Sequence, residues 1–172
     1  MLSALYTLIT HPLQFTTLQA PRTYKQVSFV CLGIASFSFV AGASSYSLFR
    51  LGLFALVILI LTTGLTAIII DFFAQCWGCV GRSLELFIGF NTTLIVFGFF
   101  PPLILLRLYL PVAFTAILSL LQFVLLVCIG YWQYRLIQSI YKVNKMKSLV
   151  LLMSPYLLGM GLLITAIIWV SI

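Results

Sequence analysis

Long apolar runs separated by short polar segments fill most of the chain. The pattern predicts five helical spans, at about residues 27–49, 53–73, 86–106, 112–134 and 149–171. A bilayer has a hydrocarbon core about 30 Å thick, which a helix of about 20 mostly apolar residues can cross. Runs such as LFALVILILTTGLTAIII are apolar on every side and lack the alternation of a membrane β-barrel. We therefore expect an all-α, polytopic integral membrane protein in which residues 26–172 form a five-helix transmembrane domain.

The segment before the first span has a different pattern. Pro12 interrupts residues 1–25, and the part after Pro12 is too short and too interrupted to cross a bilayer. Leu2, Leu5 and Leu8 fall on one helical face. We expect an amphipathic segment that lies in the membrane interface. The start lacks a basic region and a small-residue cleavage site, so a removed signal peptide is not expected.

Composition and charge agree with a membrane protein. Hydrophobic residues make up 63% of the chain and charged residues only 6%, which is far from the composition of soluble proteins. The net charge of +7 comes from basic residues scattered between apolar runs, so it does not predict nucleic-acid binding. With five spans, seven of the nine basic residues fall on the side of the N-terminus: Arg22, Lys25, Arg82, Arg135, Lys142, Lys145 and Lys147. The positive-inside rule then predicts a cytoplasmic N-terminus and a C-terminus on the opposite side.

Four of these basic residues gather in YRLIQSIYKVNKMKS, before the last span. They are Arg135, Lys142, Lys145 and Lys147, and aromatic and aliphatic residues alternate with them. One interpretation is a topology anchor at the headgroup level. The other is a surface that attracts anionic lipid or an acidic protein partner. The two interpretations are compatible, and both stay open.

The first and third predicted spans contain unusual numbers of small or polar residues. In the third, Asn91 and two threonines interrupt the apolar run, and Pro101 with Pro102 predicts a kink or break because proline lacks an amide donor. Small residues and hydroxyls are typical of helices that pack closely in lipid, so we expect both spans to face inward. The alternative is a polar transport path beside a discontinuous helix.

Only two acidic residues are present, and both lie near the connection between the second and third spans. Asp71 is about one helical turn from the predicted span end, where we expect it to be hydrated or paired with Arg82. Glu85 flanks the same connection and is expected to cap or pair. With two acids, one histidine and no Ser-His-Asp set, the sequence predicts no enzyme.

The connection itself contains QCWGC, with Cys76 and Cys79 at CxxC spacing. A structural zinc ion takes four ligands, and Cys31, Cys128 and His11 do not supply a second pair. A disulfide is not expected on a cytoplasmic, reducing side. We therefore expect no metal and no cofactor, and thiol redox chemistry is the least favoured hypothesis.

Three segments together resemble the YIP (Ypt-interacting-protein) family of five-span membrane proteins. HPLQFTTLQAP resembles the family's lead-in through Pro12, Phe15, Leu18 and Pro21. AQCWGCVGRSLE resembles its glycine-rich loop through Ala74, Gly78 and Gly81. GFNTTLIVFGFFPPLIL resembles its third span. The chain lacks the family's long N-terminal domain with its DLYGP-type motif and is similar to short prokaryotic members, which implies a prokaryotic plasma (inner) membrane.

We therefore expect a non-enzymatic, YIP-like integral membrane protein that organises the membrane or binds a protein or lipid partner. The expected partners are membrane lipids and a membrane or cytoplasmic protein, whereas self-association stays open. The alternative function is a small transporter or channel subunit with a polar path near Asp71 and the Pro101–Pro102 break.

Overall fold

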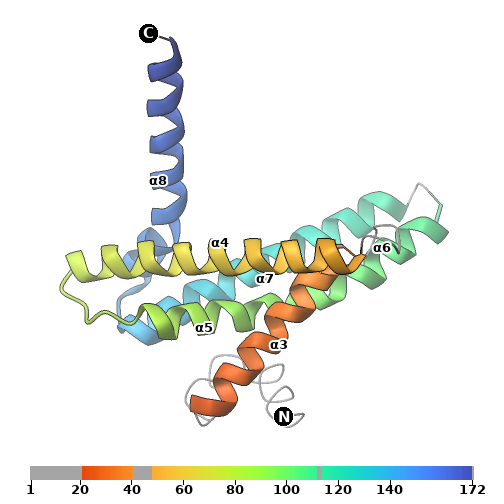
Figure 1. The fold of residues 1–172 in the computed structure, drawn as a ribbon, viewed down its shortest axis with the longest axis horizontal. Coiled ribbons are helices and arrows are strands. Elements are labelled where there is room, and N and C mark those ends of the chain that lie inside the picture. Colours follow the sequence, from red (N-terminus) through yellow and green to blue (C-terminus); the bar gives the residue numbers. More distant parts are fainter. Residues whose placement is uncertain (1–20, 41–47, 112–113, 172) are drawn as a thin grey trace.

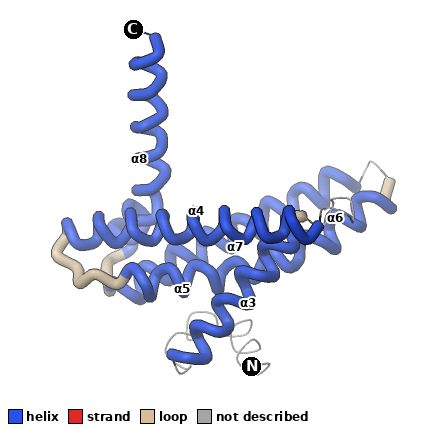
Figure 2. Tube along the Cα trace, in the orientation of Figure 1, coloured by secondary structure: helices blue, strands red, loops and turns tan. Residues whose placement is uncertain are grey.

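The computed structural model describes residues 21–40, 48–111 and 114–171, and every regular element in these ranges is helical (Figure 2). The elements are α3 (Pro21–Phe39), α4 (Leu48–Cys76), α5 (Ser83–Thr93), the 3-10 helix η1 (Leu94–Phe99), α6 (Phe100–Tyr109), α7 (Thr115–Tyr141) and α8 (Lys145–Ser171). The all-α prediction is confirmed for this part of the chain. Pro12, Phe15 and Leu18 of the predicted interfacial segment lie outside the described residues.

Within the described ranges, three helical stretches are long and apolar enough to cross a membrane: Arg50–Cys76, Ser83–Arg107 and Thr115–Tyr141. The second of them is α5, η1 and α6 joined end to end. They correspond to the three central predicted spans, while a total of five spans is not confirmed. The last of the three continues past the predicted end at residue 134, because the end of an apolar run does not mark the end of a helix whose following residues are good helix formers.

Helix α3 differs from the predicted first span. It begins at Pro21, so it runs through the expected boundary at residue 25, and it ends at Phe39 instead of continuing to residue 49. Proline suits the first helical position because the amide there has no partner within the helix. The helix crosses the bundle obliquely and packs on α4, α5 and η1 (Figure 1). Its small residues Ser28, Ala35 and Ser36 are buried, as expected for an inward-facing helix.

The third span changes its helical geometry before the prolines. Residues Leu94–Phe99 form the 3-10 helix η1, and Pro101 and Pro102 occupy the first turn of α6. At that position proline removes no necessary hydrogen bond, whereas the interior of one continuous α-helix would lose two. The predicted break is therefore the η1 segment itself.

A tight turn joins α7 to α8. Helix α7 ends at Tyr141, and the next residue, Lys142, has a left-handed φ of 52°. Asn144 Oδ1 accepts a hydrogen bond from the Lys147 N–H at 3.0 Å. The first turns of α8 then pack against α4 and α7, and Ser148 Oγ donates to the Tyr134 carbonyl at 2.8 Å.

Beyond these first turns, α8 leaves the bundle and projects away from it (Figure 1). Pro155 lies at the point where burial ends: Leu151 and Ser154 before it are buried, whereas Tyr156 after it is exposed. Proline leaves the carbonyl of Leu151 without its usual helical donor, and Ser154 Oγ bonds to that carbonyl at 2.8 Å. The helix therefore continues through the proline.

The buried centre joins α4, α5, α7 and α8. Its largest fully buried side chains are those of Ile70, Leu86, Phe90, Ile137 and Leu151. This cluster lies directly beside the connection between α4 and α5, where Asp71 is also buried. The core thus holds together the end of the bundle that contains the QCWGC segment.

Candidate functional site

The carboxylate of Asp71 is buried near the end of α4, with 6% of the residue exposed. Its Oδ1 accepts hydrogen bonds from the Arg82 backbone N–H at 2.7 Å and from the Tyr141 hydroxyl. Its Oδ2 accepts one from Gln75 Nε2 at 2.8 Å. All three donors are neutral, so hydrogen bonds rather than an opposite charge compensate the loss of water around the carboxylate.

Two glycines shape the turn that brings the Arg82 amide to Asp71. Gly78 has a φ of +78°, which a residue with a side chain rarely adopts. At Gly81 a Cβ atom would lie 2.7 Å from Gln75 Nε2 and 3.3 Å from Asp71 Oδ2. The Ala74 carbonyl accepts the N–H groups of Trp77 and Cys79, both at 3.1 Å. Each of the residues predicted as a loop motif, Ala74, Gly78 and Gly81, therefore has a geometric role in this turn.

The side chain of Arg82 has a different partner from the one expected. Its Nη1 lies 3.3 Å from Glu85 Oε2, and both side chains are about half exposed. Asp71 and Arg82 do meet, but through the Arg82 backbone amide, while the guanidinium pairs with Glu85. Glu85 pairs in the first turn of α5, where a negative charge also suits the helix dipole.

A small hollow lies beside the Asp71 cluster, between the turn and the end of α7. It has a volume of about 180 Å³ and is lined by Cys79, Val80, Arg82, Ile140, Tyr141 and Lys142. Asp71 bonds to residues in both walls, namely the Arg82 amide in the turn and the Tyr141 hydroxyl on α7. Two cationic residues, Arg82 and Lys142, thus line a hollow whose two walls are connected through the hydrogen bonds of Asp71.

The other predicted surface residues lie around the same end of the bundle, where α4 and α7 end and α8 begins (Figure 1). Lys147 Nζ is 5.9 Å from the centre of the Trp77 ring, within cation–π range. Lys145 is exposed, whereas Arg135 is partly buried and donates to Gln138 Oε1 at 3.2 Å. Of the four predicted lipid or partner residues, the three lysines are therefore accessible and the arginine is engaged within α7.

The predicted polar path is not brought together in one place. Asn91 is fully buried in α5, and neither its Oδ1 nor its Nδ2 has a hydrogen-bond partner. The neighbouring Thr92 and Thr93 hydroxyls bond back to the carbonyls of Gly89 and Phe90, each at 2.7 Å. Asp71 shares no hydrogen-bond partner with Asn91, and the Pro101–Pro102 pair lies further along the span, past η1.

The cysteines of QCWGC are free thiols. Cys76 is exposed at the end of α4, and Cys79 is partly exposed in the turn. Within the described part of the chain, no group of three or more His, Cys, Asp and Glu side chains could hold a metal ion.

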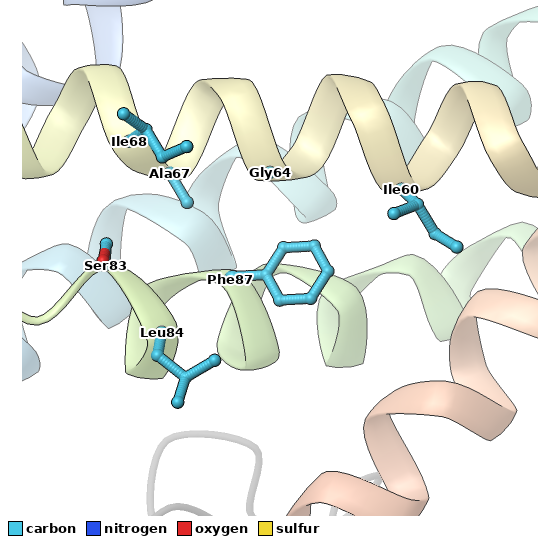
Figure 3. Close-up of a pocket in the computed structure, with 7 residues that line it drawn as sticks. All are labelled: Ile60, Gly64, Ala67, Ile68, Ser83, Leu84 and Phe87. Carbon is cyan, nitrogen blue, oxygen red and sulfur yellow. The ribbon is translucent and has the colours of Figure 1, made fainter.

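A second hollow lies between α4 and α5 on another face (Figure 3). It has a volume of about 270 Å³ and is lined by Ile60, Gly64, Ala67, Ile68, Ser83, Leu84 and Phe87. Gly64 leaves space there, since a Cβ on it would only touch the Phe87 ring at 3.8 Å. The lining is almost wholly apolar, and Ser83 supplies the one polar side chain among these seven residues.

Gln75 and Tyr141 are the site residues that sequence reasoning missed. Gln75 lies one helical turn after Asp71, so the spacing of the two on α4 was a usable signal. Tyr141 is 70 positions away from Asp71 in the sequence, and no local pattern predicts the hydrogen bond between them.

Comparisons of the chain with protein-family models, with curated proteins and with solved structures find no match. Over the described residues, fold and composition together define a helical protein with three helices able to cross a membrane.

Proposed function

We propose that this protein is a non-enzymatic integral membrane protein that organises the membrane or holds a partner through one basic end of its helix bundle. The observation that carries the proposal is the accessible set Arg82, Lys142, Lys145 and Lys147, which gathers where α4 and α7 end and where α5 and α8 begin. Juxtamembrane basic clusters attract anionic lipids and acidic protein surfaces.

The exposed side chains support membrane insertion. Phe54, Leu61 and Leu65 on α4 are each more than 60% exposed, as are Leu120 and Phe123 on α7. Apolar surface of this extent needs hydrocarbon or another protein to cover it. Arg50 and Arg107 are at the end of the bundle opposite the basic cluster, and the positive-inside rule then favours a cytoplasmic basic end.

The state of the two acidic residues supports a function other than catalysis. Asp71 is engaged by three donors, and Glu85 is paired with Arg82. Among the residues that the structure describes, neither has hydrogen-bond partners that would make up a nucleophile, a base and a stabilising donor. The membership of the YIP family in its short prokaryotic form is part of the same proposal, and the roles of Ala74, Gly78 and Gly81 in the turn support it.

Crosslinking in native membranes followed by mass spectrometry tests the proposal. The wild-type chain should capture a lipid or protein that a variant with Lys142→Gln, Lys145→Gln and Lys147→Gln captures much less. An Arg50→Gln, Arg107→Gln variant removes charge at the other end and should behave like the wild type. Recovery of the chain alone would count against a protein partner, and equal capture by all variants would count against the basic end as the contact.

The second candidate function is a small transporter or channel subunit, favoured by the buried and unpartnered amide of Asn91. An uncompensated polar group inside a membrane helix is costly and often marks a functional position. If this candidate is correct, reconstituted vesicles should show a solute or ion flux that changes in Asp71→Asn and Asn91→Leu variants. An absence of flux, or a flux that both variants leave unchanged, would eliminate it.

A further inference from the structure

We infer that the hollow lined by Arg82, Tyr141 and Lys142 binds the phosphate of an anionic phospholipid headgroup, one lipid per chain. The inference rests on the proposed function, because it specifies which ligand the basic end takes and where. It differs from diffuse attraction to a charged membrane surface in requiring a defined pocket.

The hollow lies at the depth of a headgroup. Helix α4 ends at Cys76 and helix α7 at Tyr141, and both belong to stretches long and apolar enough to cross a bilayer. The lining residues Cys79, Val80, Arg82 and Lys142 come immediately after these two helix ends. Residues that follow the end of a membrane span lie in the polar interfacial layer, where lipid phosphates are.

The lining has the chemistry that phosphate requires. Arg82 offers a planar fork of N–H donors and Lys142 a mobile point charge, which are the two side chains that bind phosphate groups in proteins. Val80 is 76% exposed and Ile140 is partly buried, so apolar side chains also line the hollow for the glycerol and the start of the acyl chains. The volume of about 180 Å³ is about six times the ~30 Å³ that one molecule occupies in liquid water, enough for a phosphate with part of a headgroup.

The hollow is built rather than accidental, because three structural features hold it in place. Asp71 joins the Arg82 backbone to the Tyr141 hydroxyl and so fixes the distance between the two walls. Lys142 has the left-handed conformation at the position after α7 where glycine or asparagine is usual. Gly81 allows the turn to approach Gln75 and Asp71. Asp71 is thus a positioning residue for the pocket.

Two negatively charged residues, Asp71 and Glu85, are near the pocket and could compete with a phosphate for its donors. Both oxygens of Asp71 already accept hydrogen bonds from neutral donors within the cluster. Glu85 competes directly, since its carboxylate lies 3.3 Å from the Arg82 guanidinium. That ion pair is exposed on both sides and therefore weak, so a phosphate can replace Glu85 as the partner of Arg82.

The test measures lipid binding to the purified full-length chain in detergent by native mass spectrometry, with phosphatidylglycerol as the anionic probe and phosphatidylcholine as the zwitterionic one. The wild type should retain one phosphatidylglycerol in preference to phosphatidylcholine. Arg82→Gln with Lys142→Gln should weaken this binding about tenfold or more, because charge-assisted hydrogen bonds to the phosphate are lost. Glu85→Gln should strengthen it, because the competitor for Arg82 is removed.

The matched control is Lys145→Gln with Lys147→Gln, which removes the same charge from the same end outside the pocket and should change binding much less. Equal losses in the two double variants would overturn the pocket while leaving the basic end as a diffuse lipid surface. Weaker or unchanged binding in Glu85→Gln would also overturn it, and this gain-of-binding variant does not depend on the stability of the double variants. No preference for phosphatidylglycerol in the wild type would overturn both the pocket and the lipid version of the proposed function.

Competition with inorganic phosphate shows whether the bound phosphate group belongs to a lipid headgroup or to free phosphate. Little displacement of the lipid by millimolar phosphate supports a headgroup site, because the lipid's glycerol and acyl chains add contacts. Complete displacement would overturn the assignment to lipid in favour of a free phosphate site.

Discussion

Asp71 is a carboxylate buried without a cation. An ionised side chain that leaves water loses several kcal/mol of solvation unless donors replace it. The Arg82 amide, the Tyr141 hydroxyl and the Gln75 amide are those donors, and they come from the turn, α7 and α4. One side chain therefore connects three elements at the basic end of the bundle.

Substitutions of Asp71 should separate its role as an acceptor from its charge. Asp71→Ala leaves the Arg82 N–H and the Tyr141 hydroxyl without their acceptor and should cost about 1–3 kcal/mol of unfolding free energy for each. Asp71→Asn keeps one acceptor oxygen and should cost less. Thermal unfolding in detergent measures the difference, with the exposed Glu85→Gln as a near-neutral control. Equal stabilities of the alanine variant and the wild type would contradict the assigned role.

Gly89 is a second position where a substitution should change the stability of the protein. A Cβ on Gly89 would overlap the Leu136 side chain and lie 3.0 Å from the Tyr24 hydroxyl oxygen, whereas a Cβ on Gly130 of α7 meets nothing within 4 Å. Gly89→Ala should therefore destabilise the protein by about 1–3 kcal/mol through overpacking. Gly130→Ala should be neutral or stabilising, because alanine favours a helix by about 1 kcal/mol over glycine. Unfolding in the same detergent compares the two, and a reversed order would show that α5 and α7 do not pack as described.

At the scale of elements, the apolar pattern predicted the helices well and their ends poorly. Leu53 to Ile70 is apolar on every side, and this run lies inside α4. The end of α7 was placed at residue 134, yet the helix continues to Tyr141 because hydropathy measures burial in lipid and not hydrogen bonding along the backbone. Pro101 and Pro102 predicted a break, and the 3-10 geometry of η1 is its form.

The start of α8 gives a prediction at this scale. Asn144 Oδ1 caps the helix by accepting the Lys147 N–H at 3.0 Å, and two lysines in the first turn oppose the helix dipole. Asn144→Ala should cost about 0.5–2 kcal/mol of unfolding free energy, and Asn144→Ser should restore most of it. Hydrogen exchange at the amides of residues 145–149 locates the effect. Unchanged exchange there in the alanine variant would exclude a capping role.

At the scale of the whole molecule, the sequence predicted which segments are helical but not how they cross. An apolar run specifies the length and composition of a helix but not the angle at which it packs on its neighbours. Helix α3 crosses the bundle obliquely, and α8 projects away from it (Figure 1). The candidate site shows the same division: Gly78 and Gly81 were readable as a turn, whereas the contact between Asp71 and Tyr141 depends on tertiary packing.

We propose that the basic end of the bundle faces the cytoplasm, and labelling with a membrane-impermeant maleimide tests this orientation. The exposed Cys76 is at the basic end, and Tyr109, which is 85% exposed, is at the other. In sealed right-side-out vesicles, Cys76 in the native chain should react only after permeabilisation. A Tyr109→Cys variant that lacks the four native cysteines should react without it. Labelling of Cys76 in intact vesicles, with protection of the cysteine at position 109, would contradict the account.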